Sequence, residues 1–284
     1  MTGKPMTGKL DGKVALVSGS GRGIGQAIAL KLAAEGARVV VNDLDTGPAN
    51  DTAARIRQAG SEAAVCTGDV AAADFGERFV KTALERFGGL DIIVNNAGFT
   101  WDSVIQKMSD EQWQTILDVH LTAPFRILRA ASEPIRIAAK KEKEEGRAVH
   151  RKVVNVSSIS GLFGNAGQVN YSAAKSALIG MTRTLAKEWG RYNVNVNCVA
   201  FGYIKTRMTQ ELSKDQVTPT TIDVAGRELP VGIQPEMIKA MERMIPLGRG
   251  GTPEEAAGAV YLFCTPESNY ISGQVVLASG GLFL

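Results

Sequence analysis

Short apolar runs alternate with longer amphipathic stretches along almost the whole chain, and this alternation is the feature that most limits its fold. The apolar runs are rich in Val and Ile and are the expected strands: residues 13–18, 37–42, 62–67, 90–95, 152–157, 193–199 and 274–278. The expected helices lie between them, at residues 22–35, 48–59, 71–87, 110–143, 168–189 and 253–265. Near-continuous apolar strands are typical of a parallel sheet that is buried on both faces. The sequence therefore predicts a doubly wound α/β fold, with about seven parallel strands and helices on both faces of the sheet.

The composition fits one large folded unit. The chain has 284 residues, of which 44% are hydrophobic. At this length about three-quarters of the surface of the unfolded chain can be buried in one core. We therefore predict a single domain over residues 1–284, with residues 1–9 flexible. Residues 206–246 carry Pro219, Pro230 and Pro235 and show no strand period, so we expect a loop-rich substrate lid there, with a disordered segment as the alternative.

Charge, hydropathy and cysteine content exclude several classes of protein. The net charge is +3, from 32 Lys and Arg against 29 Asp and Glu, and it gives no electrostatic reason to expect a nucleic-acid partner. The apolar runs are too short for a membrane span, and the polar start shows no secretory signal. Cys66, Cys198 and Cys264 are separated and odd in number, as is typical of buried thiols in a reducing, cytoplasmic compartment. His120 and His150 stand outside any ligand-spaced cluster, so we predict no metal site.

A glycine-rich turn follows the first expected strand and leads directly into a helix. Its spacing fits G-x-x-x-G-x-G through Gly19, Gly23 and Gly25. Glycine permits positive φ and lets the backbone approach a pyrophosphate closely, and the helix N-terminus offers free N–H groups to phosphate. Strand, turn and helix together predict a dinucleotide-binding Rossmann fold, although an ordinary glycine-rich turn is the alternative. The expected cofactor contacts in this turn are Gly19, Gly21, Arg22, Gly23, Ile24 and Gly25.

Asp43 stands at the end of the second expected strand and bears on the choice of cofactor. A carboxylate there hydrogen-bonds the ribose hydroxyls on the adenine side and repels a 2′-phosphate, which favours NAD over NADP. Arg22 in the glycine turn acts in the opposite direction, because a guanidinium suits phosphate. We predict NAD, with NADP less favoured. The alternative for Asp43 is a helix N-cap or a turn residue.

Tyr171 and Lys175 are spaced i and i+4, so they lie next to each other on one helix face. A phenol titrates near 10 and is a poor base at neutral pH. A neighbouring cation favours the phenolate, and we expect Lys175 to lower the pKa of Tyr171 and so make it a usable general acid and base. The alternative for this pair, taken by itself, is that Tyr and Lys meet at this spacing on a helix by chance and have no catalytic role.

Several motifs occur together in one order along the chain. They are the glycine turn Gly19–Gly25, the segment Asn95-Asn96-Ala97-Gly98, Ser158, the pair Tyr171 and Lys175, and Phe201-Gly202. This set resembles the short-chain dehydrogenase/reductase family over about Leu10 to Leu284. It departs from that family at Phe201-Gly202, where a Pro-Gly pair is usual. Within that family the offset from Ser158 to Tyr171 resembles the group of 3-oxoacyl-carrier-protein reductases and 3-hydroxyacyl-CoA dehydrogenases.

The resemblance implies hydride transfer between a nicotinamide and a carbonyl or carbinol carbon. It implies that Ser158 holds the substrate oxygen, that Tyr171 donates or accepts the proton, and that Lys175 also binds the nicotinamide ribose. The further cofactor contacts that it implies are Asp69, Val70, Asn95, Ala97, Gly98, Ile204 and Thr206. A helix N-cap is the alternative for Asp69, and a hydrogen bond at the strand end is the alternative for Asn95.

His120 stands where the family usually carries Asn, a residue thought to hold a water in the proton relay from the lysine. An imidazole has one donor and one acceptor nitrogen and is able to hold the same water. We therefore count His120 with the catalytic residues. His at this position also resembles the hydroxyacyl-CoA dehydrogenase branch. The alternative is a packed helix histidine without a part in catalysis.

The resemblance also implies self-association as a homotetramer or homodimer. Our prediction is an NAD(P)-dependent oxidoreductase that interconverts a secondary alcohol and a ketone in a small-molecule substrate, with a 3-hydroxyacyl/3-oxoacyl thioester as the leading hypothesis. The alternatives are an NADPH-dependent reductase of a carrier-protein-bound substrate, a reductase of another ketone, sterol or polyol, and a dinucleotide-binding sensor without turnover.

Overall fold

The structure is a computed structural model that describes residues 8–212, 221–224 and 227–282. Most of the segment predicted to be flexible, residues 1–7, lies outside the described residues. Residues 8 and 9 begin a turn that packs against the end of the first helix, where the backbone N–H of Leu10 donates to Glu35 O over 2.8 Å.

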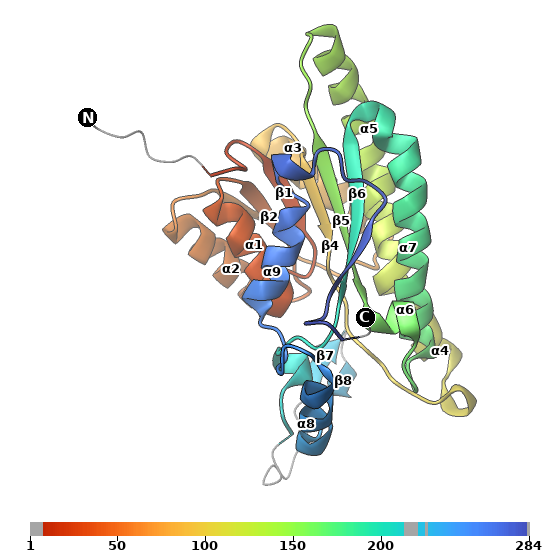
Figure 1. The fold of residues 1–284 in the computed structure, drawn as a ribbon. Helices are drawn as coiled ribbons and strands as arrows, with labels where there is room; N and C mark the ends of the chain where they lie inside the picture. Colours follow the sequence, from red (N-terminus) through yellow and green to blue (C-terminus); the bar gives the residue numbers. More distant parts are fainter. Residues whose placement is uncertain (1–7, 213–220, 225–226, 283–284) are drawn as a thin grey trace.

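The described residues form a seven-stranded sheet in the order β3-β2-β1-β4-β5-β6-β9 (Figure 1). All of its paired strands run parallel. The strands are β1 (Val14–Val17), β2 (Arg38–Val41), β3 (Ala63–Val65), β4 (Ile92–Asn95), β5 (Arg151–Ser158), β6 (Val194–Phe201) and β9 (Val275–Ala278). Each falls within or beside a predicted apolar run. The predicted α/β Rossmann fold is therefore confirmed.

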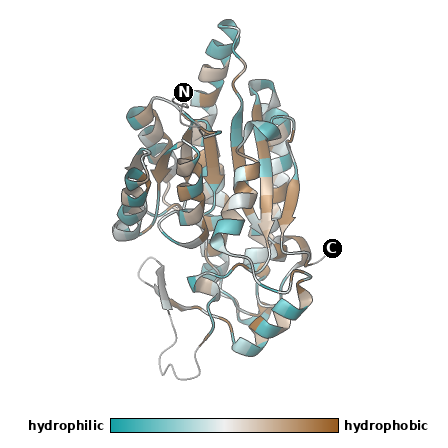
Figure 2. Cartoon of the chain, turned by 60° about the vertical axis from the view of Figure 1, so that its left-hand side comes forward, coloured by the Kyte–Doolittle hydropathy of each residue, from teal (hydrophilic) through white to brown (hydrophobic). Residues whose placement is uncertain are grey.

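Helices cover both faces of this sheet, and each face has its own buried cluster. Successive strand residues point to opposite faces, so Leu16 packs into one cluster and Val17 into the other. One face carries α1 (Gly23–Ala34), α2 (Thr46–Gln58) and α9 (Pro253–Leu262). The other carries α3 (Phe75–Phe87), α4 (Asp110–Leu117), α5 (Ala123–Glu144) and α7 (Val169–Trp189). Figure 2 shows the result, with hydrophobic strands between helices that mix hydrophobic and hydrophilic residues.

The stretch 110–143, predicted as one helix, is interrupted. A π-helical segment, Asp118–Thr122, separates α4 from α5. Pro124 in the first turn of α5 explains part of this break, because it has no N–H to donate to the carbonyl of His120 four residues earlier. Single π turns inside helices occur frequently at functional sites.

Residues 206–246 contain more regular structure than the sequence predicted. After a 3₁₀ turn at Arg207–Thr209 come β7 (Thr221–Val224) and β8 (Arg227–Pro230), which pair antiparallel, and then α8 (Pro235–Met244). In Figure 1 these elements lie beyond the carboxyl ends of β4, β5 and β6, below the sheet. Residues 213–220 and 225–226 of the predicted lid lie outside the described residues.

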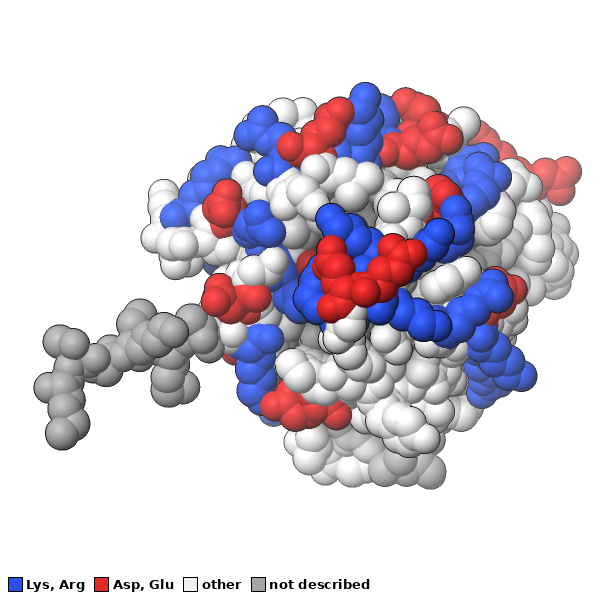
Figure 3. Space-filling view, turned by 90° about the horizontal axis from the view of Figure 1, so that it is seen from above, with Lys and Arg blue, Asp and Glu red and all other residues white. Residues whose placement is uncertain are grey.

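Positive and negative side chains are mixed on the surface, in agreement with the small net charge of +3. Lys, Arg, Asp and Glu side chains are interspersed on the face that surrounds the amino ends of the strands (Figure 3). Within the described part of the chain, every helix is too short or too polar to cross a membrane. The same residues contain no group of three or more His, Cys, Asp and Glu side chains that could hold a metal ion.

Candidate active site

The predicted site residues gather at the carboxyl ends of the central strands. The chain leaves β1 towards β2 on one side, whereas β4 continues towards β5 on the other, so a crevice opens where the winding changes direction. Ligands of open α/β sheets bind at this switch point. The glycine turn follows β1, the Asn95–Gly98 segment follows β4, and Ser158 ends β5.

The glycine turn is held against the end of β4 by short contacts. Gly19 has φ +62°, and a Cβ there would lie 2.7 Å from Ala97 Cα, so only glycine fits. The hydroxyl of Ser18 accepts hydrogen bonds from the backbone N–H groups of Asn96 (3.0 Å) and Ala97 (3.1 Å). The Asn96 amide in turn donates to Gly19 O over 3.1 Å. The turn and the end of β4 therefore form one rigid floor.

The start of α1 fits a bound phosphate. Among the described residues no side chain caps this helix, and its first turn carries no acidic residue. The N–H groups of that turn and the positive end of the helix dipole are thus available to an anion. Gly23 has φ +56°, and the nearest atom that a Cβ there would meet is the Thr206 methyl group at 4.0 Å. Gly23 and Thr206 therefore flank an open approach to the helix end, as a diphosphate requires.

Asp43 lies under the glycine turn. Its Oδ2 accepts the backbone N–H of Gly21 over 3.1 Å, and its Oδ1 accepts that of Asp45 over 3.1 Å. A Cβ on Gly21 would lie 2.5 Å from Asp43 Oδ2. The carboxylate that follows β2 is therefore fixed beside the turn, and its bond with Asp45 fits the alternative of a turn residue, whereas its contact with the cofactor ribose stays a prediction.

Ser158, Tyr171 and Lys175 come together at the end of β5. The Ser158 hydroxyl accepts the backbone N–H of Ser160 over 3.1 Å, at the start of the short helix α6 (Ile159–Phe163). Ser158 also lies close enough to Tyr171 to act on the pKa of the phenol. Lys175 is buried one turn along α7, where its Nζ lies 5.6 Å from the centroid of the Tyr171 ring. Its ammonium donates to Val156 O over 2.7 Å. The alternative of a chance Tyr–Lys pair does not explain this convergence with Ser158.

His120 lies in the π-helical segment and faces Tyr171. The two rings meet edge to face, with centroids 5.0 Å apart. The imidazole Nε2 lies 2.7 Å from Phe99 O, and among the described residues Nδ1 has no hydrogen-bond partner. A Cβ on Gly98 would lie 2.1 Å from the His120 ring, so a glycine is needed where the ring sits. The structure thus brings His120 to the site, whereas its predicted part in a proton relay stays a prediction.

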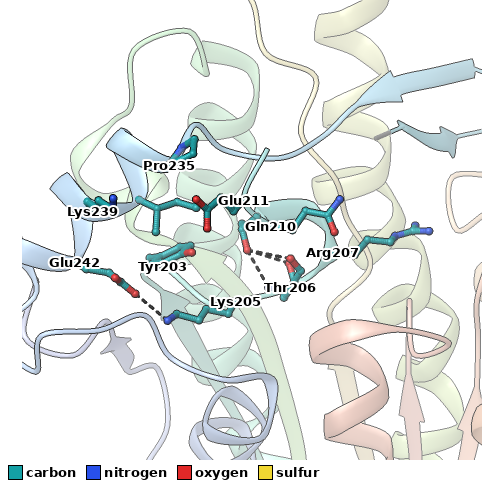
Figure 4. Close-up of a pocket in the computed structure, with 11 residues that line it drawn as sticks. Tyr203, Lys205, Thr206, Arg207, Gln210, Glu211, Pro235, Lys239 and Glu242 are labelled. Atoms are coloured by element: carbon teal, nitrogen blue, oxygen red, sulfur yellow. Dashed lines mark hydrogen bonds and ion pairs between the residues drawn. The ribbon is translucent and has the colours of Figure 1, made fainter. Parts of the chain in front are cut away.

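A hollow of about 620 Å³ lies between the segment that follows β6 and α8, and the predicted cofactor contact Thr206 is among the residues that line it (Figure 4). The segment that follows β6 lines it with Tyr203, Thr206 and Gln210, and α8 closes it from the other side. Lys205 forms an ion pair with Glu242 of α8, with Nζ and Oε1 2.8 Å apart. Ile204, the other predicted cofactor contact of this segment, is buried and bridges to Gly251.

This arrangement has close counterparts among known proteins. Residues 13–217 match the family described as short chain dehydrogenase. The chain belongs to the short-chain dehydrogenase family. It is 38% identical to a 3-oxoacyl-[acyl-carrier-protein] reductase of Synechocystis sp., over 97% of this chain and 98% of that protein. It is 39% identical to the short-chain reductase protein NovJ of Streptomyces niveus, over 94% and 93% of the two chains. A FabG 3-oxoacyl-[acyl-carrier-protein] reductase of Vibrio cholerae is 36% identical, over 97% and 99%.

As a short-chain dehydrogenase, the protein is an oxidoreductase that uses a nicotinamide dinucleotide. The glycine turn, the uncapped start of α1 and the fixed Asp43 fit such a cofactor. The residues predicted to hold it lie along the carboxyl edge of the sheet.

The pKa of Tyr171 in this short-chain dehydrogenase differs from the expectation. Burial raises it to about 12, although the hydrogen bond with Ser158 acts in the lowering direction. Burial also lowers the pKa of Lys175 to about 8. We expected the lysine to lower the tyrosine pKa, but removal from water favours the neutral form of each group and is the largest cause of both shifts.

Two predicted cofactor contacts are oriented differently from what the sequence indicated. The side chain of Asn95 points into the sheet, where its Nδ2 donates to Asn155 Oδ1 over 2.8 Å, so the strand-end alternative describes it. The exposed Asp69 accepts the backbone N–H of Ala71 over 2.8 Å and so caps a local turn beside the buried Val70. Their contacts with the cofactor stay predictions.

Sequence reasoning missed the residues that brace the cofactor floor. Besides Ser18 and Asn96, the buried Asn42 accepts the backbone N–H of Gly19 over 3.0 Å and donates to Cys66 O over 3.0 Å. It therefore ties the glycine turn to the end of β3. Polar residues at the last position of apolar strands were the available signal, since a buried amide there must find partners.

Proposed function

We propose that this short-chain dehydrogenase interconverts a 3-oxoacyl thioester and the corresponding 3-hydroxyacyl thioester, with NAD(H) as its cofactor. The observation that carries the proposal is the convergence of Ser158, Tyr171 and Lys175 beside the glycine turn. The substrate class is supported by the relatives named as 3-oxoacyl-[acyl-carrier-protein] reductases, which match nearly the full length of the chain. Residues 206–246 would cover the acyl part as a lid over the hollow beside Thr206.

Hydride exchange is the chemistry that the nicotinamide ring supplies when it is bound. Ser158 accepts the backbone N–H of Ser160 with its oxygen, and its hydroxyl would donate its proton to the substrate oxygen when a substrate is bound. Tyr171 stands next to it and would protonate that oxygen as the carbonyl is reduced, or take the proton in the reverse direction. With a pKa raised to about 12, the phenol is protonated at neutral pH and suits the reduction.

The proposed preference for NAD rests on Asp43. Its carboxylate is fixed on both oxygens and faces the region after β2, where a 2′-phosphate would bring two negative charges close to it. A higher kcat/KM with NADH than with NADPH is the expected result.

We also propose self-association as a homotetramer or homodimer. Large apolar side chains are exposed on two separate faces, with Phe125 and Ile137 on α5 and Val276 on the edge strand β9. Exposed apolar side chains on an edge strand and on a long helix favour contact with another chain.

The substrate proposal is tested by following NADH absorbance with acetoacetyl-CoA, a short 3-oxoacyl thioester. We expect turnover, and a loss of about a hundredfold or more in Tyr171→Phe with nearly unchanged NADH affinity, because only the proton donor is removed. Turnover of a steroid or polyol without turnover of acetoacetyl-CoA would contradict the thioester assignment. Activity that survives Tyr171→Phe would contradict the role of Tyr171.

A further inference from the structure

Two acidic side chains hold the guanidinium of the glycine turn. Arg22 Nη1 lies 2.7 Å from Asp45 Oδ2 and 3.7 Å from Asp43 Oδ1. Arg22 precedes α1, whereas both carboxylates follow β2, so the contact joins two loops at the edge of the cofactor crevice.

The two carboxylates differ in how firmly they are fixed. Asp43 has a side chain that is only 13% exposed and accepts backbone N–H groups on both oxygens. Asp45 is 50% exposed and makes the shorter contact with Arg22, whose side chain is 41% exposed. Asp43 is therefore part of the floor of the site, and Asp45 is the outer group that closes over the guanidinium.

Asp45 also occupies a position at which an aspartate usually does something else. It is the N-cap residue of α2, and an N-cap aspartate typically accepts a backbone N–H from the first turn of its helix. Among the described residues Asp45 makes no such capping bond, and its carboxylate binds Arg22 instead. The ion pair thus takes the place of a favourable local alternative.

A guanidinium at this edge would otherwise be a phosphate ligand. Arginine matches the geometry of phosphate oxygens and retains its charge at all relevant pH values. Arg22 and Asp43 therefore have opposite effects on a 2′-phosphate. The contact with Asp45 adds to the effect of Asp43, because the carboxylate bound to Nη1 offsets the positive charge that would attract a second anion.

We infer that Asp45 determines cofactor specificity through its ion pair with Arg22. This ion pair keeps the guanidinium from binding the 2′-phosphate of NADP(H). The inference rests on the proposed preference for NAD and explains how a chain with an arginine in its glycine turn achieves it. Asp45 acts through Arg22, whose Nη1 it holds over 2.7 Å.

The test compares dissociation constants of NADH and NADPH, measured by titration calorimetry on the full chain. In Asp45→Asn we expect NADPH to bind about fivefold more tightly, the scale of an exposed ion pair, and NADH affinity to change less than about twofold. The matched control is Asp51→Asn, which removes an exposed carboxylate from α2 without touching Arg22. It should leave the ratio of the two affinities unchanged.

A double variant separates the effect of Asp45 on Arg22 from a general effect of charge. In Arg22→Gln, the further change Asp45→Asn should no longer tighten NADPH binding, because the guanidinium to be released is gone. The inference is overturned if Asp45→Asn increases NADPH affinity no more than Asp51→Asn does. It is also overturned if Asp45→Asn still increases NADPH affinity when Arg22 is already replaced by Gln. A parent enzyme that binds NADPH more tightly than NADH would contradict the proposed NAD preference instead, and the comparison of the two asparagine variants would still decide the role of Asp45.

Discussion

At the scale of single residues, burial governs the chemistry of the proton donor. Tyr171 and Lys175 lie on one helix face, as their spacing predicts, but the sequence does not show how little water surrounds them. Removal from water raises the pKa of the phenol to about 12 and lowers that of the ammonium to about 8. The pair is therefore a protonated phenol beside a lysine that loses its charge just above neutral pH.

The first prediction concerns the pH dependence of cofactor use. Lys175 is a cation below its pKa of about 8 and loses the proton as the pH rises through that value. Since kcat/KM reports the groups of the free enzyme, we expect kcat/KM for NADH to be level at neutral pH and to fall above about pH 8. In Lys175→Arg the charge persists, so the fall should be absent. An equal fall in both enzymes would show that another group titrates.

The place of a side chain was easiest to predict where one motif fixes it, and hardest where two adjacent residues of the same type could each take it. Asn95 and Asn96 stand side by side, and the sequence does not reveal which side chain enters the sheet. Strand alternation turns Asn95 towards Asn155 and leaves Asn96 to hold the glycine turn. The partners of both come from distant parts of the chain, which a local pattern does not contain.

At the scale of elements, the β1–α1 turn depends on glycine for close backbone approach. A Cβ on Gly25 would lie 2.0 Å from Gly19 O and 2.4 Å from Asn96 Nδ2. We expect Gly25→Ala to destabilise the protein by about 2 kcal/mol, the usual cost of overpacking, and to weaken NADH binding about tenfold or more because the turn must shift. Thermal melting and NADH titration measure the two effects.

Gly47→Ala is the matched control for that change. Gly47 lies in the first turn of α2, and a Cβ there would meet nothing within 4 Å. Its melting temperature and NADH affinity should stay close to those of the parent. Equal behaviour of the two variants would contradict the role assigned to the contact between Gly25 and Gly19.

Element boundaries show where sequence patterns stop being informative. The strands of the sheet were predictable because each is a buried apolar run. The π-helical break at Asp118–Thr122 was not, since the helical period continues through it and only Pro124 signals a missing donor. The pairing of β7 with β8 was also missed, because prolines within residues 206–246 obscure the alternation that identifies strands.

At the scale of the whole molecule, a second buried lysine lies at the opposite end of the sheet from the active site. Lys152 of β5 is 3% exposed, and its ammonium donates to Asn195 Oδ1 (3.0 Å), Ser268 Oγ (3.0 Å) and Asn269 Oδ1 (2.8 Å). These partners come from β6, from the 3₁₀ turn at Pro266–Ser268 and from the residue that follows that turn. Lys152 therefore ties the segment between α9 and β9 to the centre of the sheet.

Lys152 should make the stability of the protein depend on pH. Burial lowers its pKa from 10.5 to about 8, so between these values the unfolded chain binds a proton that the folded chain has lost. Stability rises with pH wherever the unfolded state binds more protons, by about 1.4 kcal/mol per pH unit for one group.

Relative to Lys152→Met, the parent should therefore gain stability as the pH rises from about 8 towards 10, as measured by urea unfolding. Buried tyrosines are present in both proteins and cancel in the difference, and burial raises the pKa of the neighbouring Cys264 to about 12, so that thiol stays protonated over this range. Lys187→Met, which removes an exposed lysine of α7, is the control and should show no such gain. A difference between parent and Lys152→Met that stays constant over this range would show that the buried ammonium does not titrate on folding.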